Sequence, residues 1–189
     1  MTEQPTIAQL LAENPVVTAP MAGLTDQAFR EILREMGAGL IYTEMVSDMA
    51  LCYNNRKTLE MLPAATEQGP LVVQLCGSST ETMAKAAQML EELLAPAGNL
   101  VMLDINMGCP APKIVKNGEG CRLMQQPQLA ERLVAAVAEA VRLPVSVKLR
   151  LGWDSESRNV LSLAEQLVQA GAQAVAIHGR TREQFYAGQ

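Results

Sequence analysis

Residues 101–122 read VMLDINMGCPAPKIVKNGEGCR, and this stretch decides the fold prediction. The mostly apolar segment Leu100–Ile105 predicts a buried β-strand, and it leads directly into Asn106-Met107-Gly108-Cys109-Pro110. A proline cannot extend strand pairing, so Pro110 predicts that the strand ends in a defined turn. We therefore expect Cys109 to lie at the mouth of a strand, where it can do chemistry, and not inside the core.

Five further apolar segments predict strands on both sides of this one. They are Val16–Ala19, Gly39–Thr43, Leu71–Leu75, Val145–Leu149 and Ala174–His178. Apolar residues at helical spacing predict helices between the strands. We place these helices at about 6–13, 25–36, 47–59, 79–94, 127–141 and 160–170, with Thr25 as the N-cap of the second.

The alternation of strands and helices indicates the fold class. Short, continuously apolar strands are typical of a parallel sheet whose outer face is covered by helices. Six such steps favour a (β/α)8 TIM barrel that is incomplete here, because a full barrel takes about 250 residues and this chain has 189. A doubly wound sheet is the structural alternative, but no GxGxxG motif follows the first predicted strand.

Composition excludes several classes of protein. The chain is 49% hydrophobic, enough for one globular core, and it has neither a secretory leader nor an apolar run long enough for a membrane span. We therefore expect a cytoplasmic protein without a membrane partner. His178 is the only histidine, and no CxxC pair occurs, so we expect no metal site. The net charge of −5 is unlike that of a general nucleic-acid binder. Basic residues nevertheless gather in two loops, namely Lys113, Lys116 and Arg122 in one and Arg180 and Arg182 in the other.

Polar residues collect at the carboxyl ends of the predicted strands, where enzymes with parallel sheets carry their reacting groups. Lys148 is the most informative, because a lysine inside a strand that is buried on both faces needs a partner or a ligand. Gln74 and His178 fit a ligand site and a hydrogen-bonded core position equally well. Glu44 is expected to pair with an arginine of a neighbouring loop. The thiols of Cys52 and Cys76 are expected to be inert core groups.

Five fragments occur in a fixed order along the chain. They are APMAGLTD at 19–26, VQLCG at 73–77, DINMGCP at 104–110, VKLRLGW at 147–153 and IHGRT at 177–181. Each is weak alone, but together they resemble the tRNA-dihydrouridine synthases, and most closely the bacterial B-type branch. The resemblance covers nearly the whole chain.

The resemblance implies a barrel that holds FMN, takes electrons from NADPH and reduces uridine in tRNA to 5,6-dihydrouridine. It implies that Cys109 donates a proton to uracil C5 after hydride transfer to C6, which suits an ordinary thiol with a pKa of about 8.5. Asn106 is implied to contact the uracil, and Lys113 and Arg180 are expected to contact the tRNA. The implied flavin contacts are Pro20, Met21, Ala22, Gln74, Lys148 and His178.

Family members continue through two more strands, whose glycine-rich loops hold the FMN phosphate, and then through a helical tRNA-binding domain. We therefore expect residues 1–189 to form the N-terminal part of the catalytic domain and to bind FMN weakly. Two alternatives stay open. One is a related flavin barrel that oxidises or reduces a free pyrimidine or another small molecule, and the other is an inactive fragment.

Overall fold

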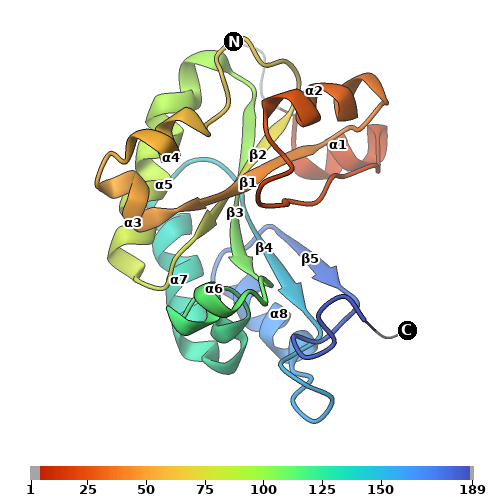
Figure 1. The fold of residues 1–189 in the computed structure, drawn as a ribbon, viewed down its shortest axis with the longest axis vertical. Coiled ribbons are helices and arrows are strands. Elements are labelled where there is room, and N and C mark those ends of the chain that lie inside the picture. The colour runs from red at the N-terminus through yellow and green to blue at the C-terminus, as the bar shows by residue number, and fades with distance from the viewer. Residues whose placement is uncertain (1–4, 188–189) are drawn as a thin grey trace.

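A computed structural model of the chain describes residues 5–187. Its centre is a sheet of five strands in the order β1-β2-β3-β4-β5, and every neighbouring pair is parallel (Figure 1). The strands are β1 (Ile41–Ser47), β2 (Leu71–Cys76), β3 (Leu100–Met107), β4 (Val145–Arg150) and β5 (Ala174–His178). This confirms the predicted parallel α/β architecture, and the described residues form an incomplete (β/α)8 barrel.

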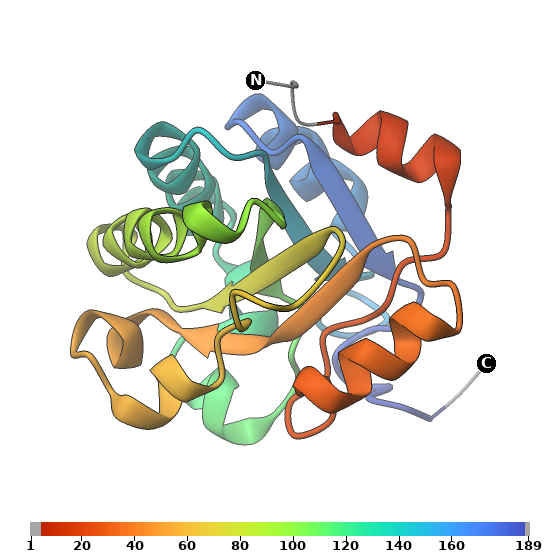
Figure 2. The same ribbon diagram turned by 90° about the horizontal axis from the view of Figure 1, so that it is seen from above.

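Helices connect the strands and cover the sheet. Figure 2 shows α3, α5, α7 and α8 in a row along the outer side of the curved sheet, with α1 and α2 lying apart from that row. The helices are α1 (Ile7–Glu13), α2 (Gln27–Glu35), α3 (Asp48–Cys52), α4 (Arg56–Glu60), α5 (Thr80–Leu94), α6 (Pro112–Lys116), α7 (Pro127–Ala140) and α8 (Val160–Gln169). Two 3₁₀ turns are η1 (Ala95–Ala97) and η2 (Gly120–Gln125).

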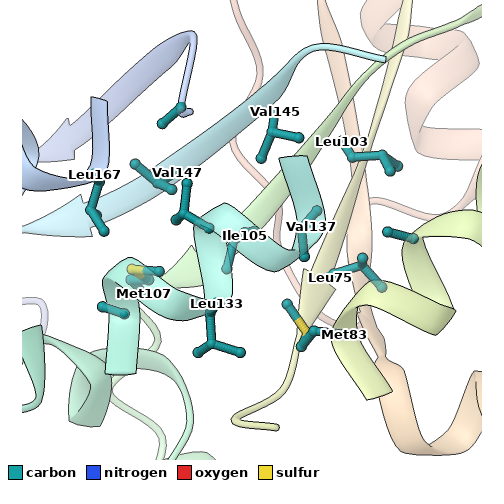
Figure 3. Close-up of a cluster of buried hydrophobic side chains, with 14 of the residues drawn as sticks. Leu75, Met83, Leu103, Ile105, Met107, Leu133, Val137, Val145, Val147 and Leu167 are labelled. Carbon is teal, nitrogen blue, oxygen red and sulfur yellow. The ribbon is translucent and has the colours of Figure 1, made fainter. Parts of the chain in front are cut away.

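The main hydrophobic core lies between the sheet and the outer helices. Side chains from β2, β3 and β4 meet apolar residues of α5, α7 and α8 there (Figure 3). A smaller cluster joins Ile7 of α1 to Tyr42, Val72 and Met102 of the sheet. Burying the apolar faces of helices against apolar strands supplies most of the stability of such a layer. The carboxyl ends of the strands are thereby held on one rigid edge.

The first predicted strand is wrong in extent. Residues 16–19 do not join the sheet as a strand, and they make only a single parallel bridge, between Val17 and Leu40. Pro15 and Pro20 bracket this segment, and a proline has no N–H group to donate to a ladder. The segment also has a pairing partner on one side only, so Val16 and Val17 stay 56% and 42% exposed.

The helix predicted at about 47–59 is also wrong, because two short helices occupy this region. Asn54 has a positive φ of 52°, which ends α3, and the side chain of Asn55 then caps α4 by accepting a hydrogen bond from Thr58 N. The N-cap predicted for α2 needs correction too. Asp26 caps that helix, while Thr25 is fully buried.

A buried ion pair ties α2 to the segment that leads into β2. The Arg30 guanidinium donates from Nε to Glu67 Oε1 and from Nη2 to Glu67 Oε2, both at 2.7 Å, and from Nη1 to Thr25 O at 2.7 Å. Both charged side chains are only 1% exposed. A bidentate pair of this kind is balanced while both partners are present, but either charge alone would be buried without compensation.

Replacing Glu67 with Gln is therefore expected to lower the free energy of unfolding by about 3–5 kcal/mol. Urea unfolding followed by circular dichroism measures this change. The matched control is Glu60→Gln, which breaks the exposed Arg56–Glu60 pair on α4 and should leave the unfolding midpoint nearly unchanged. Equal effects of the two substitutions would contradict the structural role of the buried pair.

Candidate active site

A cavity of about 580 Å³ opens at the carboxyl edge of the sheet. One wall comes from the loop that precedes α2, and the other comes from the ends of β2 to β5 and the loop after β3. Eight of the ten site residues predicted from the sequence line this cavity: Pro20, Met21, Ala22, Gln74, Asn106, Cys109, Lys148 and His178. Segments far apart in the sequence thus converge on one space.

The two remaining predicted residues lie outside the cavity lining. Lys113 is exposed on α6, and Arg180 is half-buried in the loop after β5. Neither position reaches the space that Cys109 and Lys148 share. If these two residues contact a substrate, that substrate must extend well beyond the cavity.

The loop at the cavity mouth is held by its own hydrogen bonds. The hydroxyl of Thr25 accepts a bond from Met21 N and donates one to Met21 O, both at 3.1 Å. The carboxylate of Glu44 accepts a bond from Gly23 N, so its partner is this backbone and not the arginine expected from the sequence. These contacts fix the backbone while Met21 and Ala22 stay exposed. The loop can therefore offer an apolar surface to a ligand.

Cys109 is half-buried, and hydrogen bonds on both sides hold its backbone. Its N–H donates to Asn106 Oδ1 at 2.9 Å, and its carbonyl accepts from Cys121 N at 3.0 Å. The preceding carbonyl, that of Gly108, accepts from Arg150 Nε at 2.8 Å and from Cys121 Sγ at 3.0 Å. The thiol therefore projects from a loop that is fixed relative to β3 and β4.

The other three cysteines do not line the cavity. Burial raises the pKa of the Cys76 thiol, which donates to Glu119 Oε2 at 3.4 Å, and raises the pKa of Cys121 to about 12. Cys52 is the half-buried last residue of α3, and its pKa is also raised, mainly by burial. These three thiols are protonated at neutral pH, as expected of packing residues.

Lys148 and His178 lie on the neighbouring strands β4 and β5, and both line the cavity. The register pairs Lys148 with Asn106 on β3, and Arg150 with His178 on β5. Burial lowers the pKa of Lys148, and the carboxylate of Asp104 opposes this change. Burial, together with the charges of Arg150 and Lys148, also lowers the pKa of His178. The neutral imidazole is therefore favoured beside a cationic neighbour.

Asp104 is the buried polar residue that sequence reasoning missed. Its side chain is fully buried in β3 and accepts hydrogen bonds from Ser146 Oγ at 2.5 Å and from Gln74 Nε2 at 2.7 Å. Burial raises its pKa to about 6, against the effect of both hydrogen bonds and of Lys148. A lone carboxylate inside the apolar run VMLDINM is the signal that could have drawn attention to it.

A second concave surface lies beside the cavity, and we call it the Trp153 groove. It has a volume of about 560 Å³, and its charged lining residues are Lys116, Arg122 and Arg182. The guanidinium groups of Arg182 and Arg122 lie 4.6 Å and 5.9 Å from the centroid of the Trp153 ring. These cation–π contacts hold two positive charges at the surface of the groove.

Two classes of site were not found within residues 5–187. No group of three or more His, Cys, Asp or Glu side chains is placed to hold a metal ion there. In the same range, no helix combines the length and the apolar character that crossing a bilayer requires.

The sequence matches the family model of dihydrouridine synthases over residues 17–189. The tRNA-dihydrouridine synthase B of Pseudomonas syringae pv. tomato is 44% identical over 184 residues, covering 97% of this chain and 53% of the relative. The enzyme of the same name from Pseudomonas aeruginosa is 41% identical over 176 residues, covering 93% and 52%. A probable tRNA-dihydrouridine synthase of Rickettsia conorii is 38% identical over 183 residues, covering 96% and 54%. The chain therefore spans about half the length of the curated relatives it matches.

Solved structures support the fold alone. Phosphonopyruvate hydrolase, solved with oxalate and Mg²⁺, superposes with a TM-score of 0.57 at 17% identity, covering 90% of this chain and 61% of that one. A carboxyl transferase domain of Rhizobium etli pyruvate carboxylase, solved with pyruvate, gives a TM-score of 0.50 at 17% identity, covering 85% and 26%. These neighbours are TIM-barrel enzymes, in agreement with the incomplete barrel described above.

Gly120 is expected to be essential for the position of Cys109. A Cβ at Gly120 would lie 2.6 Å from Cys109 O and 3.1 Å from Cys109 Cβ, and its φ is +59°. Gly120→Ala should therefore displace the loop and change the alkylation rate of the Cys109 thiol, as measured by mass spectrometry. Gly98→Ala is the control, because Gly98 has a similar φ of +69° but no neighbour within 4 Å. Similar Cys109 reactivity in the two variants would contradict this prediction.

The pH dependence of stability should reveal the buried carboxylate of Asp104. Its folded-state pKa of about 6 lies above the ordinary value of 3.8, so protonation favours the folded state. The stabilisation is complete below about pH 4 and is lost as the pH rises through 6. Relative to Asp104→Asn, the wild-type free energy of unfolding should fall by up to about 3 kcal/mol between pH 4 and pH 7. Urea unfolding at a series of pH values measures the difference, and parallel curves for the two proteins would refute it.

Proposed function

Because this chain belongs to the dihydrouridine synthase family, we propose that it provides the catalytic face of an enzyme that reduces uridine in tRNA to 5,6-dihydrouridine. The proposed cofactor is FMN and the proposed reductant is NADPH, in a family that is flavin-dependent in general. The observation that carries the proposal is the single cavity in which the thiol of Cys109 faces the same space as Lys148 and His178. An enzyme with this substrate is expected in the cytoplasm.

The cavity fits a flavin in size and in the distribution of polarity. Its volume of about 580 Å³ falls within the roughly 300–1,000 Å³ typical of cofactor sites. The loop of Pro20, Met21 and Ala22 offers an apolar wall, and Gln74, Lys148 and His178 offer hydrogen-bonding groups opposite. A flavin ring has an apolar end and a polar, carbonyl-bearing end, so both walls have a counterpart. When bound, the flavin would supply the hydride for uracil C6.

Lys148 would stabilise negative charge at the polar end of the cofactor ring. A cation that is already in place costs no reorganisation when that charge develops. Burial alone disfavours the charged ammonium, but the carboxylate of Asp104 works in the opposite direction. Asp104 therefore helps Lys148 to keep its proton in a partly buried position.

Cys109 would act as the general acid. A thiol ordinarily holds its proton at neutral pH, so it can donate that proton to C5 of a uracil that gains a hydride at C6. The resulting thiolate regains a proton from solvent, to which the half-buried loop has access. No base is hydrogen-bonded to the Cys109 thiol among the described contacts, which suits proton donation better than nucleophilic attack.

Asn106 would contact the substrate as a hydrogen-bond donor only. Its Oδ1 already accepts bonds from Gly108 N at 3.1 Å and from Cys109 N at 2.9 Å. One Nδ2 hydrogen is donated to Gln74 Oε1, and the other faces the sulfur of Met45 at 3.5 Å. A thioether is a weak acceptor, so a substrate carbonyl oxygen could replace it at little cost.

The RNA would dock on the basic rim around the cavity. Lys113 and Arg180 lie outside the cavity lining, as contacts to a large polyanion require. The Trp153 groove adds the cations Arg122 and Arg182, which lie over the Trp153 ring and could neutralise phosphates. Extracting a uridine from folded RNA costs a few kcal/mol, and such contacts would offset that cost.

Two substitutions separate the half-reactions of the proposed enzyme. Cys109→Ala should leave FMN binding and its reduction by NADPH unchanged, but should slow dihydrouridine formation in tRNA by about 10²–10⁴-fold. Lys148→Ala should weaken FMN binding or slow flavin reduction. Flavin fluorescence, stopped-flow absorbance and mass spectrometry of tRNA nucleosides measure the three quantities.

The control is Cys52→Ala, because Cys52 does not line the cavity. It should leave both half-reactions unchanged. Because only weak binding is expected of residues 1–189, the result that would contradict the proposed cofactor is no change in flavin fluorescence even at high concentrations of the wild-type chain. Equal loss of both half-reactions in Cys109→Ala would contradict the proposed proton donor.

A further inference from the structure

A continuous chain of hydrogen bonds runs through the sheet beneath the cavity, from the carboxylate of Asp104 to the loop of Cys109. Gln74 Nε2 donates to Asp104 Oδ2 at 2.7 Å, and Asn106 Nδ2 donates to Gln74 Oε1 at 2.9 Å. The N–H groups of Gly108 and Cys109 then donate to Asn106 Oδ1 at 3.1 Å and 2.9 Å. The side chains of Asp104, Gln74 and Asn106 are 0%, 2% and 6% exposed, so water cannot easily replace these partners.

We propose that Asp104 is a positioning residue, which fixes the orientation of the Gln74 and Asn106 amides and thereby holds the loop that carries Cys109. The consequence for catalysis rests on the proposed function, but the positioning itself does not. It follows from the hydrogen-bonding capacity of the three side chains.

The donor-to-acceptor direction of the hydrogen-bond chain depends on its carboxylate end. An amide group has a donor end and an acceptor end that are nearly equal in shape, so Gln74 and Asn106 could each adopt two orientations. An ionised carboxylate can only accept, and therefore the amide nitrogen of Gln74 must face Asp104. The Gln74 oxygen then faces Asn106, which turns the Asn106 nitrogen toward Gln74 and its oxygen toward the loop.

The other end of the hydrogen-bond chain, at the loop, requires the same orientation of the two amides. The backbone N–H groups of Gly108 and Cys109 can only donate, and they meet the Asn106 oxygen. If Gln74 were reversed, Asn106 would have to reverse as well, and its NH₂ group would then face two N–H groups. Buried donors without acceptors are strongly unfavourable. The position of the loop is therefore linked to the carboxylate of Asp104, which lies four residues before Gly108.

Other contacts should keep the fold intact when this link is broken. Arg150 Nε and Cys121 Sγ hold the carbonyl of Gly108 independently of the amides, and Ser146 Oγ binds the other carboxylate oxygen of Asp104. Loss of the Asp104 charge should therefore loosen the Gly108 and Cys109 amides without unfolding the sheet. A residue that merely fills space in the core would not have this local effect.

Amide hydrogen exchange tests the proposal at pH 8, without flavin or tRNA. Asp104→Leu removes the acceptor that orients the Gln74 amide, and we expect it to lower the protection of the Gly108 and Cys109 amides at least tenfold. The matched control is Ser146→Ala, which removes the other hydrogen bond to the same carboxylate but does not affect the orientation of Gln74. It should leave both amides protected. Unchanged protection in Asp104→Leu, or equal loss in the two variants, would overturn the proposal.

A double substitution that exchanges the carboxylate and the amide should restore protection by reversing the hydrogen-bond chain. In Asp104→Asn combined with Asn106→Asp, the amide at position 104 can donate to Gln74 Oε1, and Gln74 Nε2 can donate to the new carboxylate. The other oxygen of that carboxylate can still accept from Gly108 and Cys109. Protection should return to within about threefold of the wild type, a margin well inside one decade. Persistent loss of protection in the double variant would overturn the proposed role of the hydrogen-bond chain.

A measurement on the unsubstituted protein covers the case in which Asp104→Leu does not fold. Protonation of Asp104 near pH 6 should reproduce the loosening. Protection of Gly108 and Cys109, corrected for intrinsic exchange and compared with the buried amide of Leu75, should fall several-fold between pH 8 and pH 5. No change would contradict the proposal. The groups that face this carboxylate are Tyr42 on β1, Gln74 on β2, and Ser146 and Lys148 on β4.

All of these readouts are independent of turnover. If the chain forms no dihydrouridine but the amide protection changes as described, the proposed function fails and the positioning role stands. If dihydrouridine forms at the wild-type rate and with wild-type loop protection in Asp104→Leu, the positioning role fails and the proposed function stands.

Discussion

The two hydrogen bonds that Asn106 Oδ1 accepts from Gly108 N and Cys109 N are the interaction on which the candidate site depends. β3 is paired on both sides by β2 and β4, and the backbone needs new partners where it leaves the sheet. Asn106 supplies them from the end of the strand itself. Arg150 and Cys121 hold the carbonyl of Gly108 from β4 and η2. The thiol position is therefore fixed from three elements at once, as a reacting group requires.

The buried charged groups beneath the cavity lower the free energy of unfolding. Burial disfavours the ionised forms of Asp104 and Lys148, and it shifts their pKa values in opposite directions. Two such groups on neighbouring strands are more typical of a functional site than of a core selected for stability. The Arg30–Glu67 pair provides the contrast, because it is bidentate, lies outside the cavity lining and serves to join α2 to the sheet.

The sequence was sufficient for those features that depend on neighbours along the chain. Apolar runs located the five strands, and parallel pairing then required that Cys109 and Lys148 meet at one edge. It was insufficient where the deciding partner is distant in sequence. The apolar stripe of α2 indicated a helix, but its buried residue is Arg30, whose partner Glu67 lies 37 positions away. The acceptor role of Asp104 likewise depends on partners 30 and 42 positions away.

The total charge of −5 was the main argument against an RNA partner, and the structure shows why that argument is weak. Arg122 and Arg182 are distant in sequence, yet both guanidinium groups lie over the ring of Trp153. At physiological ionic strength, exposed charges are screened beyond about 8 Å. A polyanion at the groove would therefore interact more strongly with these two cations and Lys116 than with carboxylates on distant helices. If RNA docks at this groove as proposed, the charge within one screening length of the groove matters more for association than the sum over the whole sequence.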